Sequence, residues 1–528
     1  MPTLNWIGKD AVVDHHRQVP YHLLRCDEKL SVGDPGSGNL LVQGDNLLAL
    51  KALLPYYAGQ VKCIYIDPPY NTGNENWVYN DNVNSPEIKA WLGKVVGGEA
   101  EDLSRHDKWL CMMYPRLSLL REMLSEDGVF LCSIDENELY PLKLILDELF
   151  GRQRCVGTIC WKMRNTDNRV KSRLSTDHEY VLVYSKGGPL VGRVIDRSDF
   201  KNPDNDPRGP YVTDPLTGKA ATDDRPNLHY RIENPATGDS WEPDPARGWI
   251  TDQAGFNSLL SEKRVWWPPN PKRGKPRKKR YLSETSERMP VSSFWTEIRG
   301  QTGADEVDQI LGERLFAFPK SLDLITRLLD IACPKDALIL DSFAGSGTTA
   351  HAAMALNLAD GGTRRVVSVE MDPQIAENVT AKRLRRALEG YQDLEGTEVP
   401  PIGGGFRFCR LSHPIFDENG QIHPEVRFAD LAAHVFFTET GEPIPKRPTG
   451  KTPLIGVCNG TAYYLLFNGV LGDKRPDGGN VLTARVLEGL PAHDGPKIVY
   501  GEGTRLGSGR LSRQDIVFRQ VPYEIETQ

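Results

Sequence analysis

The chain has 528 residues, a formal net charge of −7 and a hydrophobic content of 39%, which is ordinary for a folded globular protein. At roughly 150 residues per domain, this length predicts two to four domains. The acidic total argues against a protein that coats nucleic acid without discrimination, but it allows a basic face. No apolar run is long enough to span a membrane and no secretion signal is recognisable, so we expect a cytoplasmic protein without a membrane partner.

Nine cysteines are scattered along the chain, an odd number without a CxxC pair. Several lie inside apolar stretches such as VKCIYI and VFLCSI, where a cysteine behaves as a small core residue. This usage predicts free thiols in a reducing compartment, with neither a disulfide framework nor a zinc site, and we expect no metal.

Strands and helices alternate through residues 1–162. LLVQGD (40–45) and VKCIYID (61–67) are predicted strands, with the helical run NLLALKALLPYY between them. After a polar stretch come the helix WLCMMYPRLSLLREMLSEDG, the strand VFLCSID and a helix ended by Gly151, and then two strands, CVGTICW and EYVLVYS. This alternation with short connections predicts parallel strands in an α/β sheet.

The composition changes between about residues 163 and 310. Segments such as KNPDNDPRGPY and WWPPNPKRGKPRKKR are rich in Pro, Gly, Asp, Asn and Arg, which predicts turns and exposed loops in an insertion. Regular alternation resumes over 311–410 with SLDLITRLLDIA, ALILD, a further helix and RRVVSVE. We therefore predict one domain in two parts, 1–162 and 311–410, interrupted by the insertion 163–310 and followed by a mixed C-terminal region, 411–528.

The motif Asp67-Pro68-Pro69-Tyr70 follows directly after the strand VKCIYI. Open α/β sheets bind ligands at the carboxyl ends of their strands, where this motif would lie. The prolines lack N–H donors and have a fixed φ, so the Asp67 side chain and the Pro68 carbonyl can accept hydrogen bonds from an NH2 group, while Tyr70 stacks on a planar base. The alternative is an Asp-Pro turn with a locally packed tyrosine.

The segment DSFAGSGTT (341–349) lies between the strand ALILD and the helix TAHAAMAL. Its small residues let a ligand approach the backbone, and the next helix presents free N–H groups. It lacks the GKS or GKT of a phosphate-binding P-loop and the spacing of GxGxxG. About twenty residues later Glu370 ends a strand, where an acid can hold ribose hydroxyls. The pattern predicts a nucleoside-type cofactor without a pyrophosphate, and a plain glycine-rich turn with an unrelated glutamate is the alternative.

These segments resemble the amino-group DNA methyltransferases. DSFAGSGTT resembles their S-adenosylmethionine (SAM) loop, and DPPY fits their catalytic motif of Asp, Asn or Ser followed by Pro-Pro and an aromatic residue. Further similar segments occur in the family's usual order and cover most of residues 40–410: VQGDNLLALKAL, YIDPPYNTGNENWVYNDN, WLCMMYPRLSLLREMLSEDGVFLCSIDENE, HEYVLVYSK and FPKSLDLI.

The order of the motifs, with the catalytic motif before the insertion and the SAM loop after it, is that of the β group. NTGNENWVYNDN is similar to the modification (Mod) subunits of type III restriction systems. The resemblance implies a Rossmann-like SAM-dependent methyltransferase with permuted motifs, a target recognition region within 163–310, double-stranded DNA as substrate and a restriction subunit as partner. The region 411–528 remains the candidate for homodimer or partner contacts.

The resemblance implies methyl transfer from SAM to the exocyclic amine of a base flipped out of duplex DNA. Asp at the first motif position favours adenine N6, and cytosine N4 is the alternative. The expected catalytic residues are Asp67, Pro68, Pro69 and Tyr70. Two other classes stay open: an RNA or protein amide methyltransferase, which usually has the SAM loop first, and a non-catalytic DNA-binding subunit.

The residues expected to hold SAM lie in four segments. They are Asp341, Phe343, Ala344, Gly345, Ser346, Gly347 and Thr348 in the loop, Glu370 at the ribose, Asp45 at the adenine, and Phe318, Lys320 and Ser321 at the methionine end. The assignments of Asp45 and of residues 318–321 depend on the resemblance.

The insertion contains a densely cationic run. Its candidate DNA contacts are Lys272, Arg273, Lys275, Arg277, Lys278, Lys279 and Arg280. In a DNA enzyme we favour phosphate contacts for this run, and a solvated flexible loop is the alternative. Trp266 and Trp267 fit a wedge or stacking platform for bases and a small core of the insertion equally well. His178 is expected to be a structural strand residue.

Overall fold

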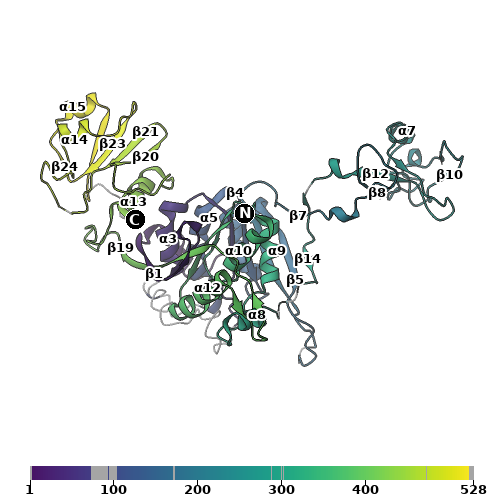
Figure 1. Ribbon diagram of the computed structural model, residues 1–528, viewed down its shortest axis with the longest axis horizontal. Helices are drawn as coiled ribbons and strands as arrows, with labels where there is room; N and C mark the ends of the chain where they lie inside the picture. The colour runs from purple at the N-terminus through teal and green to yellow at the C-terminus, as the bar shows by residue number, and fades with distance from the viewer. Residues whose placement is uncertain are drawn as a thin grey trace. The chain divides into compact units, whose positions relative to one another are not determined.

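The computed structural model describes residues 3–72, 93, 104–170, 173–286, 288–298, 300, 302–470 and 472–522. The chain forms two compact units (Figure 1), which we call the main unit (Met1–Val191 with Ser292–Gln528) and the inserted unit (Gly192–Val291). The inserted unit is shorter at both ends than the predicted insertion, because the flanking strands β6 (His178–Ser185) and β14 (Phe294–Trp295) belong to the sheet of the main unit. Most of NTGNENWVYNDN lies outside the described residues.

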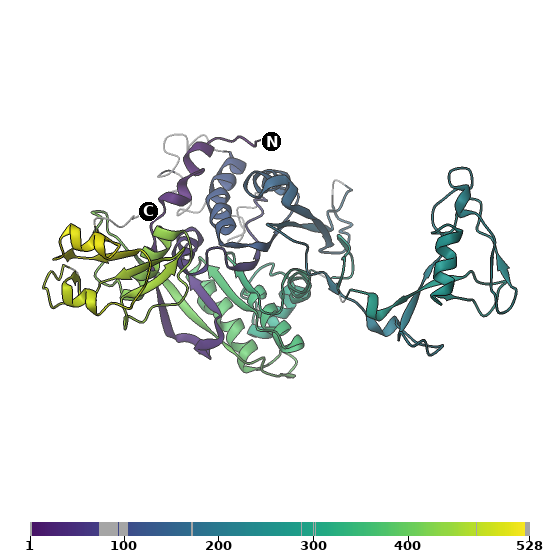
Figure 2. The ribbon, with the colours of Figure 1, turned by 90° about the horizontal axis from the view of Figure 1, so that it is seen from above.

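The main unit is built on a ten-stranded sheet of order β1-β19-β2-β16-β15-β3-β4-β6-β5-β14. Its five central strands are parallel: β2 (Leu40–Gln43), β16 (Arg365–Glu370), β15 (Leu338–Asp341), β3 (Val61–Ile66) and β4 (Leu124–Ile134). The two strands that follow the insertion, β15 and β16, therefore lie between β2 and β3, which precede it, and the purple and green ribbons interleave in Figures 1 and 2. This confirms the predicted α/β fold.

The outer strands complete the sheet with mixed directions. On one side, β6 pairs antiparallel with β4 and with β5 (Cys155–Lys162), and β14 pairs parallel with β5. On the other side, β19 (Gly405–Pro414) pairs parallel with β2 and antiparallel with β1 (His22–Gly33). Because β19 crosses residue 410, the sheet continues past the predicted end of the domain.

Helices pack on this sheet, and side-chain caps fix where several of them begin. Asp45, Ser104 and Ser321 each accept hydrogen bonds from N–H groups of the first turn of a helix, a favourable capping arrangement. α3 packs against α5, and α9 packs against α10. Among the described residues outside the inserted unit, the helices of at least eight residues before α13 are α3 (Asn46–Tyr57), α5 (Arg105–Met123), α6 (Leu139–Leu146), α8 (Thr302–Leu311), α9 (Leu322–Ala332), α10 (Thr348–Asp360) and α12 (Lys382–Glu389).

Two predictions of the sequence analysis are wrong within this domain. LSEDG is predicted to end a helix, but Leu124 already pairs with Val61 as the first residue of β4. Free thiols are predicted throughout, but Cys26 and Cys409 form a disulfide. These two cysteines face each other on β1 and β19, 383 residues apart in sequence, and no local pattern could bring them together. The other seven cysteines have free thiols.

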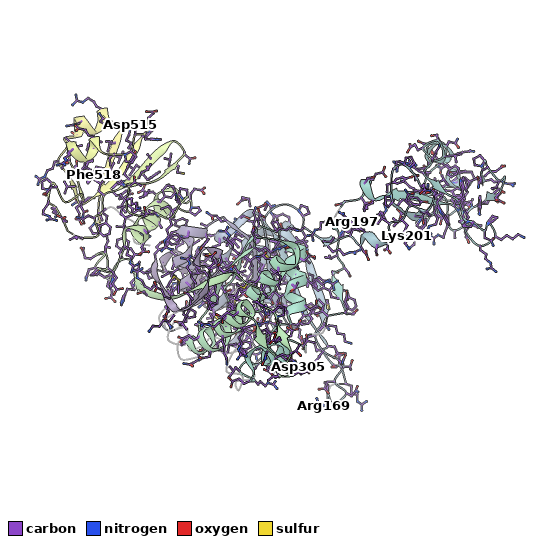
Figure 3. The ribbon with its side chains drawn as sticks, viewed as in Figure 1. Arg169, Arg197, Lys201, Asp305, Asp515 and Phe518 are labelled. Atoms are coloured by element: carbon purple, nitrogen blue, oxygen red, sulfur yellow. A yellow bond between two sulfur atoms is a disulfide. The ribbon has the colours of Figure 1, made fainter. Side chains whose placement is uncertain are left out.

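The C-terminal region is part of the main unit. α13 (Phe428–Thr440) packs against α3, and the Ile444 N–H donates to the Pro55 carbonyl. A second sheet follows with its own apolar core and the order β20-β21-β23-β25, whose last strand carries Phe518 (Figure 3). Its elements are β20 (Leu454–Cys458), β21 (Thr461–Leu465), β23 (Lys497–Gly501), β25 (Ile516–Gln520), α14 (Ala484–Glu488) and α15 (Ser508–Arg513).

The inserted unit has a small core of its own, in line with one of the two interpretations of its tryptophans. A three-stranded sheet of order β11-β12-β8 lies beside one helix. The elements are β8 (Tyr211–Pro215), β11 (Val265–Trp266), β12 (Arg277–Tyr281) and α7 (Gln253–Ser261). The buried side chains of its largest apolar cluster are Leu216, Ile232, Trp241, Trp249, Phe256 and Val265.

Short elements complete the described fold, and no helix among the described residues is long and apolar enough to cross a membrane. The remaining helices are α1 (Lys9–Val12), α2 (His15–Gln18) and α11 (Pro373–Ile375). The remaining strands are β7 (Arg193–Val194), β9 (Ile232–Glu233), β10 (Ser240–Trp241), β13 (Arg288–Met289), β17 (Tyr391–Gln392), β18 (Glu398–Val399), β22 (Val481–Leu482) and β24 (Gly503–Thr504).

Candidate active site

The two predicted motifs meet at the carboxyl edge of the central sheet. Asp67 is the residue after β3, and Asp341 is the last residue of β15, its parallel neighbour. Both carboxylates line one cleft at this edge. The lining residues are Tyr65, Asp67, Phe316, Phe318, Pro319, Lys320, Ile325, Asp341, Phe343, Ala344, Gly345, Ser346, Thr348 and Thr349.

The glycine-rich loop has a backbone that only glycine adopts readily. Gly345 and Gly347 have φ values of 50° and 78°, in the left-handed region. A Cβ at Gly345 would lie 3.1 Å from the Phe316 ring, and one at Gly347 would lie 3.0 Å from the Thr380 side chain. The loop is therefore a narrow cradle of backbone that leaves room for a ligand in the cleft.

Asp341 holds the start of this loop. Its buried carboxylate accepts hydrogen bonds from the Phe343 N–H at 3.0 Å and from the Thr349 hydroxyl at 2.6 Å. Burial raises the pKa of Asp341 to about 7, despite these two hydrogen bonds. The carboxylate thus joins the strand, the loop and the first turn of α10.

Glu370 and Asp45 lie at the same sheet edge, but neither lines the cleft. The Glu370 carboxylate accepts from the N–H groups of Gly345 at 2.8 Å and Asp372 at 2.9 Å, which ties the loop to the end of β16. Asp45 caps α3 and forms an ion pair with Arg116 at 3.1 Å. The structure thus gives both acids supporting contacts, and their predicted roles at the ribose and the adenine stay predictions.

Asp67 and Tyr70 of the catalytic motif form a cluster of four polar side chains with Glu179 and Lys320. The Tyr70 hydroxyl donates to Asp67 Oδ1 at 2.9 Å and to Glu179 Oε2 at 3.2 Å. The Lys320 Nζ lies 3.0 Å from Asp67 Oδ1, 3.5 Å from Glu179 Oε2 and 4.7 Å from the centroid of the Tyr70 ring. We call Asp67, Tyr70, Glu179 and Lys320 the acidic cluster, because it holds two carboxylates and one ammonium.

Burial and charge set the protonation of the acidic cluster. Burial and then the charges of Asp67 and Glu179 raise the pKa of Tyr70 well above 10, so its phenol stays neutral. Burial also raises the pKa of Glu179, although the Lys320 ammonium opposes this. Burial alone would lower the pKa of Lys320, but the two carboxylates outweigh it and raise the pKa above 10.5. Lys320 is therefore charged at neutral pH.

Hydrogen bonds fix the backbone of the catalytic motif at Pro69 and at the residue after the motif, Asn71. The indole N–H of Trp109 donates to the Pro69 carbonyl at 2.6 Å. Asn71 follows the motif with a φ of 57°, and its side-chain amide donates to the buried Glu138 carboxylate. These contacts fix the direction in which the chain leaves the cleft.

The segment before α9 joins the two halves of the site. Phe318 and Lys320, which are predicted for the methionine end, both line the cleft, and the Lys320 ammonium lies 3.0 Å from Asp67 Oδ1. The Lys320 carbonyl accepts from the Thr348 hydroxyl at 3.2 Å. Ser321 is buried and caps α9, so its hydroxyl has a structural contact.

Two residues of the site were missed by sequence reasoning. Glu179 is the second residue of β6, an acid at the start of an apolar strand, and the antiparallel direction of β6 brings it to Tyr70 and Lys320. Arg383 is fully buried, and its guanidinium donates to the hydroxyls of Ser346 at 3.0 Å and Thr348 at 2.7 Å. His178, beside Glu179, contacts the Tyr180 hydroxyl and stays outside the acidic cluster.

The cationic run of the inserted unit is a turn followed by the strand β12. Lys279 is buried and pairs with Asp204 and with Asp206, so its ammonium cannot reach a phosphate, contrary to the prediction. Arg280 pairs with Asp214, and Arg277 donates to Thr213. Three cations before the strand are exposed: Lys272, Arg273 and Lys275.

Trp267 belongs to the core of the inserted unit. Its ring stacks on Trp241 with a centroid distance of 5.5 Å and packs against the apolar cluster of that unit. The core interpretation is thus favoured over a stacking platform for this residue.

The described side chains contain no group of three or more His, Cys, Asp and Glu that could hold a metal ion.

An α/β sheet that brings a glycine-rich cradle and the aspartate of an Asp-Pro-Pro-Tyr motif to one cleft defines a SAM-dependent methyltransferase. Comparison with known proteins narrows this class. A family model described as DNA methylase matches residues 61–382, from β3 to the first residue of α12. The chain belongs to this family of DNA methylases, and SAM is accordingly its cofactor.

Three curated relatives show the extent of the similarity. The chain is 34% identical to the type III restriction-modification enzyme StyLTI Mod subunit of Salmonella typhimurium, over 72% of this chain and 60% of that protein. It is 32% identical to the EcoPI Mod subunit of Escherichia phage P1, over 83% of this chain and 74% of that protein. It is 32% identical to the type II methyltransferase M.KpnI of Klebsiella pneumoniae, over 71% of this chain and 93% of that protein.

Proposed function

We propose that this protein is a site-specific DNA methyltransferase that transfers the methyl group of SAM to adenine N6 in duplex DNA. One observation carries the proposal: Asp67 of the catalytic motif and the glycine-rich loop line the same cleft. An amine bound at Asp67 therefore lies next to the cofactor site. Family membership supports DNA as the substrate.

One group of residues at the cleft would bind SAM, and another would bind the target amine. SAM supplies an electrophilic methyl group when it is bound, and Gly345, Ser346 and Thr348 are the residues that would hold it. The target amine is engaged in base pairing within duplex DNA, so the base has to leave the stack to reach the cleft. Asp67 and the Pro68 carbonyl then accept hydrogen bonds from the amine and direct its lone pair to the cofactor side. Holding two reactants in this way supplies up to roughly 7–11 kcal/mol of the barrier reduction in favourable cases.

The geometry serves cytosine N4 as well as adenine N6, since both are exocyclic amines beside a ring nitrogen. Asp at the first position of the motif favours adenine, and the names of the type III relatives favour a restriction-modification system. In that setting we propose a restriction subunit as partner, a cytoplasmic location with access to DNA, and the region 411–528 as the site of partner or homodimer contacts. We also propose the inserted unit as the target recognition region.

The proposal is tested with purified protein, SAM and DNA that is free of modified bases. Mass spectrometry of the digested nucleosides is expected to show N6-methyladenine for the wild type and none for Asp67→Ala. Asp14→Ala is the matched control, because Asp14 is an exposed carboxylate that pairs with Arg17 on the surface. N4-methylcytosine would change the target base, and methylation by Asp67→Ala would contradict the assignment of Asp67.

A further inference from the structure

The catalytic carboxylate already has donors where the target amine would bind. Asp67 Oδ1 receives the Tyr70 hydroxyl at 2.9 Å and lies 3.0 Å from the Lys320 ammonium. The side chain of Lys320 is only 11% exposed and that of Asp67 15% exposed, so water does not weaken this ion pair much. An incoming amine has to compete with a buried ammonium for the same oxygen.

Glu179 gives that ammonium a second place to bind. Its carboxylate lies 3.5 Å from the Lys320 Nζ and accepts from the same Tyr70 hydroxyl. A lysine side chain is flexible, and its three N–H donors can be reoriented. A small movement of Lys320 away from Asp67 therefore keeps the ammonium paired, because Glu179 takes over the contact.

We propose that Lys320 is a displaceable partner of the catalytic carboxylate: it occupies the amine position on Asp67 in the empty site and moves to Glu179 when the target amine binds. This inference rests on the proposed methyl transfer and assigns Lys320 and Glu179 as positioning residues. It replaces the predicted role of Lys320 at the methionine end of the cofactor.

Charge balance explains why both residues are needed. With Lys320 present, the acidic cluster carries two negative charges and one positive charge, which leaves one negative charge for an amine that becomes positive on methylation. Without Lys320, two buried carboxylates would share one hydroxyl, and one of them would retain a proton at neutral pH. Without Glu179, the ammonium would remain on Asp67 and block the amine.

The same residue connects this exchange with the cofactor loop. The Lys320 carbonyl accepts from the Thr348 hydroxyl, which in turn receives a hydrogen bond from the buried Arg383. The base of the Lys320 side chain is therefore anchored to the loop, and the movement is limited to its flexible end. SAM binding and amine binding can thus be separated by experiment.

The test is a double-mutant cycle with Lys320→Met, Glu179→Gln and the double variant, read as single-turnover methylation rates at saturating SAM. Each single variant is expected to lose roughly tenfold or more at pH 7, and the double variant is expected to be faster than either, because the two defects cancel. The rate of Lys320→Met is expected to rise with pH from 6 to 9 more steeply than that of the wild type, as the shared proton is lost.

Binding and folding are measured in the same samples. SAM affinity by calorimetry is expected to change less than about threefold in every variant, since the loop anchor is a backbone carbonyl. The pair Lys186 and Glu126, which does not line the cleft, supplies matched controls, Lys186→Met and Glu126→Gln, which are expected to keep the wild-type rate. If Lys320→Met does not fold, Lys320→Gln takes its place, and Glu179→Asp is expected to recover part of the rate lost by Glu179→Gln.

Three results would overturn the inference in an active protein. The first is a double variant whose rate loss equals the product of the losses in the two single variants. The second is a pH profile of Lys320→Met that is parallel to that of the wild type. The third is a loss of SAM affinity as large as the loss of methylation rate. Absence of methylation by the wild-type protein would instead overturn the proposed function, and this inference with it.

Discussion

Asp341 is a single residue whose burial has a measurable cost. Its carboxylate is 2% exposed, and burial raises its pKa to about 7. Below pH 4 the group is protonated in both the folded and the unfolded chain. Between about pH 4 and pH 7 the unfolded chain releases the proton while the folded chain keeps it, so this group lowers the folding stability as pH rises. Above pH 7 the cost is constant.

Asp341→Asn is expected to remove this pH-dependent cost, because the amide oxygen still accepts from the Phe343 N–H. The free energy of unfolding of the variant, relative to the wild type, is expected to rise by roughly 1–3 kcal/mol between pH 5 and pH 8. Urea denaturation at several pH values measures it. A difference that does not change with pH would show that Asp341 is already ionised in the folded chain.

Gly347 is expected to be irreplaceable for cofactor binding. Gly347→Ala puts a Cβ 3.0 Å from Thr380 at a φ of 78°, and the left-handed backbone alone costs roughly 1–2 kcal/mol. We expect a tenfold or greater loss of SAM affinity by calorimetry. Gly361→Ala is the control, because Gly361 ends the next helix with a φ of 68° and has nothing within 4 Å. Equal SAM affinity in both variants would refute this role of the loop.

At the scale of the element, the best sequence predictions are those with a local signal. Central parallel strands are buried on both faces, so β3, β15 and β16 are largely apolar and could be predicted together with their helices. β1 alternates irregularly, and its place depends on pairing with β19 at the other end of the domain. The Lys320 to Glu179 contact joins two distant segments, and only the folded sheet reveals it.

The cationic run contains exposed residues in the turn before β12 and a buried lysine within β12, and we expect their replacement to have different effects. Replacing exposed Lys272, Arg273 and Lys275 by Gln is expected to weaken DNA binding and to lower the salt dependence by roughly 0.9 for each phosphate that is no longer neutralised. Lys279→Met is expected to destabilise the inserted unit by roughly 1.5–3 kcal/mol, because it removes the ammonium that pairs with the buried Asp206, which keeps its contacts with Arg208 and Tyr281. Fluorescence anisotropy at several salt concentrations measures DNA binding by the triple variant. Thermal denaturation measures the stability of Lys279→Met. An unchanged salt slope in the triple variant would exclude phosphate binding by these three residues.

At the scale of the whole molecule, the two compact units have separate apolar cores. A variant in which a Gly-Ser linker replaces Gly192–Val291 is expected to bind SAM within about threefold of the wild type, since every residue of the cleft lies in the main unit. Its DNA methylation is expected to be lost, because the proposed recognition region is absent. Retained methylation at a specific DNA sequence would place recognition in the main unit.

The most direct measurement is single-molecule sequencing of DNA from cells that produce either the wild-type protein or Asp67→Ala. We predict N6-methyladenine at one sequence motif with the wild type and its complete loss with Asp67→Ala, whose amine acceptor is missing. The same modification in both strains, or none in either, would contradict the claim that the cleft at Asp67 methylates DNA.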